Sequence, residues 1–183
     1  MRSYRRFRRC HRTHRMYATI SAMLHSGCIR FGLFGNTDPM MEDIVFRAID
    51  ELYLLTTTWH KTGKSNKPYT IKFPRRPPPN HPTRYALPGR SGPSYVSAGE
   101  IIEWYIRSEA EIVSTHGALF SPLSVVLNRR SHYMNWLREV TLAAIPESAP
   151  FIKLIRPHGL REGWATDRSR QNVPTHTLAA EGR

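Results

Sequence analysis

The stretch from Lys64 to Val96 constrains the fold more than any other part of the sequence, because it holds eight of the chain's 14 prolines and no acidic residue. Proline fixes the backbone φ angle and cannot donate a hydrogen bond, so a run of this density favours extended, solvated backbone over a helix or a central strand. We therefore predict two small units joined by a Pro-rich basic linker. The predicted boundaries are 1–63, 64–96, 97–166 and a flexible tail at 167–183.

Charge is the second constraint, since the 183 residues contain 27 Lys and Arg against 14 Asp and Glu, a formal net charge of +13. No acidic residue precedes Asp38, and none occurs from Leu52 through Gly99. Such an excess favours polyanionic partners such as nucleic acid or an anionic membrane surface, although it bears on association and not on fold. The two acid-free stretches are therefore candidate contact surfaces.

The N-terminal residues predict a basic amphipathic helix behind a run of arginines. Its apolar residues recur near helical spacing at Phe7, Tyr17, Ile20 and Leu24. An Arg-rich, acid-free start is also typical of an organellar transit peptide, so a cleaved leader of about 30 residues is an alternative. The segment from Met16 to Ile29 is too short and too polar to span a bilayer. Because Cys10 and Cys28 cannot form a disulfide framework, we expect an intracellular protein. Because no segment is long and apolar enough to span a bilayer, we expect no membrane partner.

A longer helical pattern follows at residues 38–63. Asp38 suits a helix N-cap and Pro39 suits the first helical position, while Gly63 suits a C-terminal stop. The apolar residues at steps of three and four are Met41, Val45, Ala48, Leu52, Leu55 and Trp59. The pattern predicts one amphipathic helix whose apolar stripe faces a core.

The second unit reads as three helices followed by a hairpin. Ser97 and Glu100 have the spacing of a capping box, so we predict a helix from Ser97 to about Gly117. Ser121-Pro122 predicts the start of another helix, and a third runs through Tyr133 to about Ile145. Two short strands with a Pro-His-Gly turn are predicted over residues 151–166. The fold class is therefore mainly α, with a winged-helix-like second unit.

No catalytic motif is complete, and we expect a protein that is not an enzyme and has no metal, cofactor or small-molecule substrate. Gly63-Lys64-Ser65 resembles the end of a P-loop, but the motif's first glycine position holds Thr58. The spacing of the two cysteines with His14 and His25 matches no common zinc site. Glu109 and Glu111, at i and i+2, point to different faces of a helix and are predicted to be solvated.

The segment DIVFRAIDELYLLTTTWHKTGKSNKPYTIKFPRRP, which ends at Pro77, resembles a family of short proteins of actinobacterial tailed phages, the tail assembly chaperones and their downstream-frame companions. Members of that family look like an apolar helix that ends in tryptophan, followed by a Lys-rich turn, a Lys-Pro pair and a closing Pro-Arg-Pro. In this chain Arg76 interrupts the closing Pro-Arg-Pro. The basic stretch before it, RSYRRFRRCHRTHRMYATISAMLHSG, resembles the family's basic helix. The resemblance covers residues 1 to about 80 and does not extend to residues 78–183.

The resemblance implies a non-enzymatic phage morphogenesis protein that binds tail structural subunits, located in the host cytoplasm or associated with the virion. The residues predicted to bind the partner are Met41, Val45, Leu52, Leu55, Trp59, Lys61, Lys64, Lys67 and Arg75. The alternative function is DNA binding by a winged helix-turn-helix in residues 97–166. Its predicted nucleic-acid-binding residues, all on the third helix, are Arg129, Arg130, His132, Asn135 and Arg138.

Overall fold

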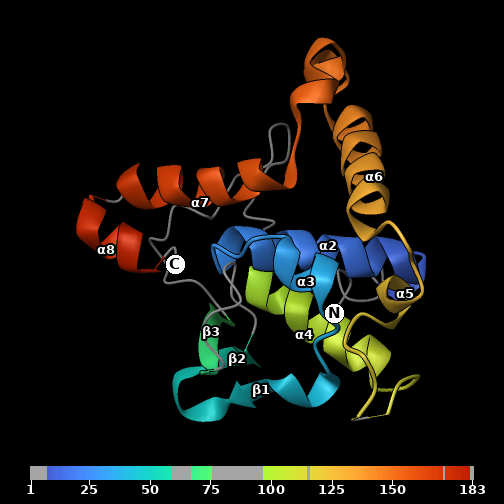
Figure 1. Ribbon diagram of the computed structural model, residues 1–183, viewed down its shortest axis with the longest axis vertical. Coiled ribbons are helices and arrows are strands. Elements are labelled where there is room, and N and C mark those ends of the chain that lie inside the picture. Colours follow the sequence, from blue (N-terminus) through green and yellow to red (C-terminus); the bar gives the residue numbers. More distant parts are fainter. Residues whose placement is uncertain (1–7, 59–66, 76–96, 115, 171, 182–183) are drawn as a thin grey trace, which may run out of the picture.

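The structure is a computed structural model, and it describes residues 8–58, 67–75, 97–114, 116–170 and 172–181. This part of the chain is mainly helical with a small antiparallel sheet (Figure 1), which confirms the predicted class. The α-helices are α2 (Arg12–Ser26), α3 (Gly32–Asn36), α4 (Ala98–Glu109), α5 (Ser121–Ser124), α6 (Arg129–Ala144), α7 (Pro157–Arg170) and α8 (Thr175–Glu181). The 3-10 segments are η1 (Met41–Asp43), η2 (Ala48–Asp50) and η3 (Pro146–Leu154), and the strands are β1 (Ile44–Arg47), β2 (Leu52–Thr57) and β3 (Tyr69–Pro74).

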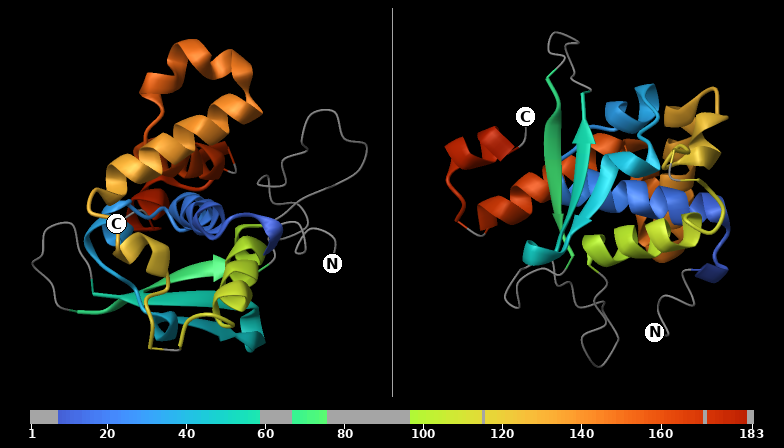
Figure 2. Two further views of the ribbon diagram at one scale, coloured as in Figure 1. Left: turned by 90° about the vertical axis from the view of Figure 1, so that its right-hand side faces the viewer. Right: turned by 90° about the horizontal axis from the view of Figure 1, so that it is seen from below.

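Helix α2 lies at the centre of the fold. The sheet is on one side of it and α6 on the other (Figure 2, left), and α4 and α7 pack along it. Apolar residues at steps of three and four form its buried face, namely Met16, Tyr17, Ile20, Met23 and Leu24. The predicted N-terminal amphipathic helix is therefore confirmed for residues 12–26, because this spacing places the apolar side chains on one stripe.

The predicted helix over residues 38–63 is wrong, since η1, β1, η2 and β2 occupy residues 41–57. β1 and β2 form an antiparallel hairpin in which Val45 pairs with Leu54 and Arg47 with Leu52. Alternation along the strands buries Tyr53 and Leu55 on the inner face of the sheet. β-branched and aromatic residues dominate both strands, and this composition outweighs an apolar spacing that also fits a helix.

β3 completes the sheet in the order β1-β2-β3 and lies within residues 64–96, where the sequence predicts a linker. Residues 69–74 alternate in burial, and Phe73 is fully buried against the helices, so this segment belongs to the core. Residues 64–66 and 76–96 of the predicted linker lie outside the described residues.

Helices α4 and α6 confirm two of the predicted helices of the second unit. The Ser97 hydroxyl accepts a hydrogen bond from Glu100 N at 3.1 Å, and the Glu100 carboxylate accepts one from Ser97 N at 2.9 Å, which completes the capping box. α4 ends at Glu109, earlier than predicted, and α5 starts at Ser121 as predicted. The Asn128 side chain caps α6 by accepting a hydrogen bond from Ser131 N.

The predicted hairpin over residues 151–166 is wrong, because η3 and α7 cover those residues. Pro157 is the first residue of α7, a position at which its missing N–H costs nothing and its fixed φ favours a helix. The end of α7 and all of α8 lie in the stretch predicted to be a flexible tail.

The two predicted units share one hydrophobic core. Tyr133 of α6 stacks on Phe31 with 4.8 Å between ring centroids, and its hydroxyl lies 2.7 Å from the Ser21 hydroxyl of α2. Phe34 and Phe120 meet edge to face at 5.2 Å. Aromatic and aliphatic contacts therefore join residues 12–34 directly to residues 98–133.

A buried carboxylate links α2 to α4. Glu109 is fully buried, contrary to the solvated position predicted for it. Its Oε2 accepts hydrogen bonds from Arg12 Nε at 2.9 Å and Arg12 Nη2 at 2.5 Å, and its Oε1 lies 3.7 Å from Arg15 Nη2. The hydrogen bond to Glu109 raises the pKa of Arg12. These arginines compensate the carboxylate, because an unpaired charge is costly to bury.

Candidate protein-binding surfaces

The residues predicted to bind a partner do not form one surface. Leu55 is buried in the core, and Met41 packs against the core from outside. Val45 and Leu52 share the outer face of the sheet, where Val45 is exposed and Leu52 half-buried. Lys67 is exposed just before β3. Trp59, Lys61 and Lys64 lie outside the described residues.

Arg75, the last predicted partner-binding residue, has a structural role. It forms a two-point ion pair with buried Glu103 of α4, from Nε to Oε2 at 2.8 Å and from Nη2 to Oε1 at 3.1 Å. The hydrogen bond to Glu103 is the main cause of a raised Arg75 pKa. The guanidinium also lies 5.5 Å from the centroid of the Phe46 ring. Arg75 therefore fastens β3 to α4 and is not free to bind a partner.

The residues predicted to bind nucleic acid also divide into two groups. Arg129 is bound within the protein, donating to the carbonyl of Thr37 at 3.0 Å and to Asp38 at 2.9 Å. Arg138 donates to the Lys153 carbonyl at 3.4 Å. Arg130, His132 and Asn135 are exposed in the N-terminal half of α6.

A further exposed apolar surface lies on residues 137–154, which we call the projecting arm. The arm is the C-terminal part of α6 with η3, and it stands away from the α2 and α4 layer (Figure 1). α6 buries Tyr133 alone among its residues, all of which are described, and η3 buries none. Large apolar side chains with 38% to 71% exposure cover the arm, namely Val140, Leu142, Ile145, Phe151 and Leu154.

The arm holds its shape through local contacts. Pro146 and Pro150 prevent α6 from continuing, and the chain turns into η3, which packs back on α6. Ile145 N donates to the Thr141 carbonyl at 2.8 Å, and Ser148 N donates to the Ile145 carbonyl at 2.9 Å. Proline-bounded 3-10 structure thus presents apolar side chains to solvent without a core beneath them.

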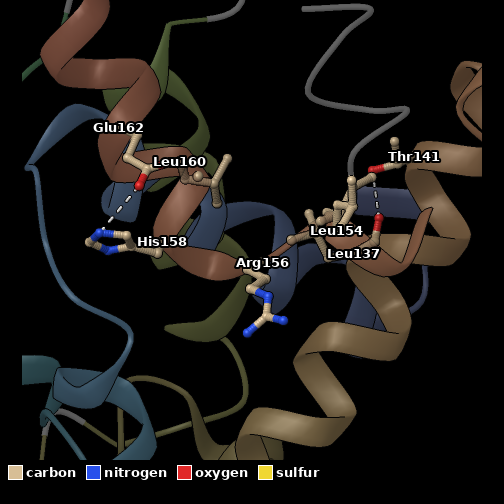
Figure 3. A pocket seen from close by; sticks show the side chains of 9 residues that line it. Leu137, Thr141, Leu154, Arg156, His158, Leu160 and Glu162 are labelled. Carbon is tan, nitrogen blue, oxygen red and sulfur yellow. Dashed lines mark hydrogen bonds and ion pairs between the residues drawn. The ribbon is translucent and has the colours of Figure 1, made fainter. Parts of the chain in front are cut away.

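A cavity of about 340 Å³ lies where the arm meets α7 (Figure 3). Its apolar wall consists of Leu137, Leu154 and Leu160 with Ile155. Exposed Arg156 also lines the cavity, and its guanidinium points away from the leucines. On the rim opposite the leucines, His158 Nε2 lies 3.4 Å from Glu162 Oε1. The cavity can therefore accept an apolar side chain beside a cation.

Sequence reasoning missed the arm as a functional surface. A run of apolar residues interrupted by two prolines was the available signal, but its residues up to about Ile145 were predicted as a helix and those from Phe151 as a strand. In the part of the chain that the structure describes, no helix combines the length and apolar composition needed to cross a membrane. Nor do the described residues bring together three or more His, Cys, Asp or Glu side chains in a position to hold a metal ion.

Comparison with known proteins adds no relative, because no family model, no curated protein and no solved structure matches this chain.

Proposed function

We propose that this protein works by binding another protein, without catalysis, and that the projecting arm is its main contact surface. The observation that carries the proposal is the exposed apolar cover of α6 and η3, where five large side chains have no core to enter. Large exposed apolar side chains gathered on one projecting element are typical of interaction sites. From the resemblance of residues 1 to about 80 to tail assembly chaperones, the partner class that we propose is phage tail structural subunits, bound in the host cytoplasm.

Burial of the five arm side chains would supply part of the free energy of a complex. Complete burial of a large aliphatic or aromatic side chain contributes about 1.5 to 3 kcal/mol. The five arm side chains are already partly covered, so roughly 1 kcal/mol each is a reasonable contribution in a complex. The total of several kcal/mol offsets much of the free energy lost in association.

Coexpression with the tail tube and tape-measure proteins of an actinobacteriophage, followed by copurification, tests the proposal. We expect the wild-type chain to copurify with one of them and the Phe151→Ser/Leu154→Ser variant to lose the partner. Ile112→Ser is the matched control, because Ile112 is also an exposed aliphatic residue but lies after α4, outside the arm. Absence of any wild-type complex, or equal loss in the control, overturns the proposal.

The outer face of the sheet is the second surface to test in the same experiment. It carries Val45 and Leu52, two of the residues predicted to bind the partner. If Val45→Ser abolishes copurification and Phe151→Ser/Leu154→Ser does not, the partner binds the sheet and not the arm.

DNA binding is the second candidate function, and the specific observation in its favour is the exposure of Arg130, His132 and Asn135 on α6 in a chain of net charge +13. No wing is present at residues 151–166, so such binding would use the helix without the hairpin. A gel-shift titration discriminates between the functions, because DNA binding weakens steeply with salt whereas apolar protein capture does not.

A further inference from the structure

The tip of the β1–β2 hairpin is an exposed apolar knob with acidic neighbours. Ile49, in η2, is 93% exposed. Asp50 and Glu51 follow it, and Glu51 adopts a left-handed backbone with φ of 50° that ends the turn. Arg47 pairs with Asp50, whereas Glu51 is half exposed and accepts one long hydrogen bond, of 3.4 Å, from Arg75. The tip therefore presents the aliphatic side chain of Ile49 beside the half-exposed carboxylate of Glu51.

The cavity at the base of the arm has the complementary character. Leucines form its wall, and exposed Arg156 belongs to its lining with a guanidinium that points away from the leucines (Figure 3). His158 pairs with Glu162 on the far rim, which leaves exposed Arg156 as the cation of the lining that a carboxylate can meet. An aliphatic side chain followed by a carboxylate therefore matches both the lining and the charge of this cavity.

We propose that the hairpin tip of one copy binds the arm cavity of a second copy, with Ile49 in the apolar wall and Glu51 paired with Arg156. The knob and the cavity are different surfaces, so the contact is heterologous. In Figure 1, whose vertical direction is the longest axis, the hairpin and the arm lie at opposite ends. Repetition of the contact therefore builds a ring or an open chain of copies, depending on whether the rotation between neighbours closes.

This self-association goes beyond the capture of a tail subunit, and the two are tested separately. Sedimentation velocity of the full chain over a roughly hundredfold concentration range measures it. We expect the wild-type sedimentation coefficient to increase with concentration. Ile49→Asp and Arg156→Glu should each weaken association by roughly tenfold or more, since one removes a buried anchor and the other opposes Glu51.

Mixing the two variants gives the sharpest result. Ile49→Asp keeps an intact cavity and Arg156→Glu keeps an intact knob, so an equal mixture should form a one-to-one dimer that grows no further. Ile112→Asp and Arg130→Glu are matched controls for exposed apolar surface and for charge, because both residues are exposed and lie outside the hairpin tip and the cavity lining. Both variants should associate like the wild type. A wild-type monomer at all concentrations, an unrescued mixture, or equal losses in the controls overturns the proposal.

Discussion

Replacing Glu109 by Gln should destabilise the fold far more than an ordinary charge change, because this carboxylate is fully buried and contacts two arginines of α2. Removing one partner of a buried ion pair costs about 3 to 5 kcal/mol, since the remaining charge is left uncompensated. The Arg12 side chain keeps 32% exposure, so hydration offsets part of that cost and the lower end applies. We expect a loss of about 3 kcal/mol, a drop in Tm of roughly 6 to 12 °C for a chain of this size.

Glu111→Gln is the matched control, measured with Glu109→Gln by urea unfolding and by thermal melting followed by far-UV circular dichroism. Glu111 pairs with Arg8 at 2.6 Å, a distance like that of the Glu109 pair, but both side chains are more than half exposed. Exposed pairs contribute about 0 to 1 kcal/mol, so this variant should unfold almost like the wild type. Equal losses in both variants, or a loss below about 1 kcal/mol at Glu109, would refute the argument from burial.

Three further measurements test the packing and the electrostatics of the core. Gly99→Ala should lower the free energy of unfolding by about 1 to 3 kcal/mol, since its Cβ would lie 2.2 Å from a main-chain oxygen at the end of β3. Gly159→Ala in α7 is the control, because its Cβ would meet nothing within 4 Å, and it should be neutral or stabilising in the same urea titration. Burial, aided by Glu103, raises the pKa of Tyr53 to about 12. The folded protein therefore retains that proton above a normal tyrosine pKa of about 10, and this contribution to stability, complete below pH 10, is lost as the pH rises towards 12. Urea midpoints at about pH 9 and 11 should fall less in Tyr53→Phe than in the wild type. Tyr133→Phe removes the 2.7 Å hydrogen bond to Ser21 and should cost about 1 kcal/mol in thermal melts, and an unchanged Tm would contradict this.

Local signals in the sequence were sufficient to predict α2 and α4, two helices of the core. The Ser97 capping box starts α4, and the apolar spacing of residues 16–24 predicts the buried face of α2. Both signals depend on neighbours within two helical turns, so the rest of the chain does not alter their meaning.

The hairpin at residues 44–57 shows where such reasoning fails. Val45, Leu52 and Leu55 fit a helical stripe, but strand pairing places Val45 outside and Leu55 inside. The aromatic residue Tyr53 and the β-branched run of threonines after Leu55 carried the strand signal. Pro157 was read as a turn former because it precedes His-Gly, although proline also begins helices.

The candidate site was harder to predict than the fold. Whether the apolar residues of the arm are core or surface depends on what packs above them, which is decided by elements far away in the sequence. Arg75 and Arg129 illustrate the converse, since each looked like a free cation until its distant acceptors, Glu103 and Asp38, were placed beside it.

The shared core also determines when this protein can fold during its own synthesis. α2 leaves the ribosome before the helices that cover it, because α4 begins only at Ala98 and α6 at Arg129. At about 5 to 20 residues per second, the apolar face of α2 stays uncovered for several seconds on the nascent chain. An Arg-rich helix with an open apolar face is then accessible to ribosome-associated chaperones and proteases, so slower translation of residues 27–97 should lower the yield of folded protein.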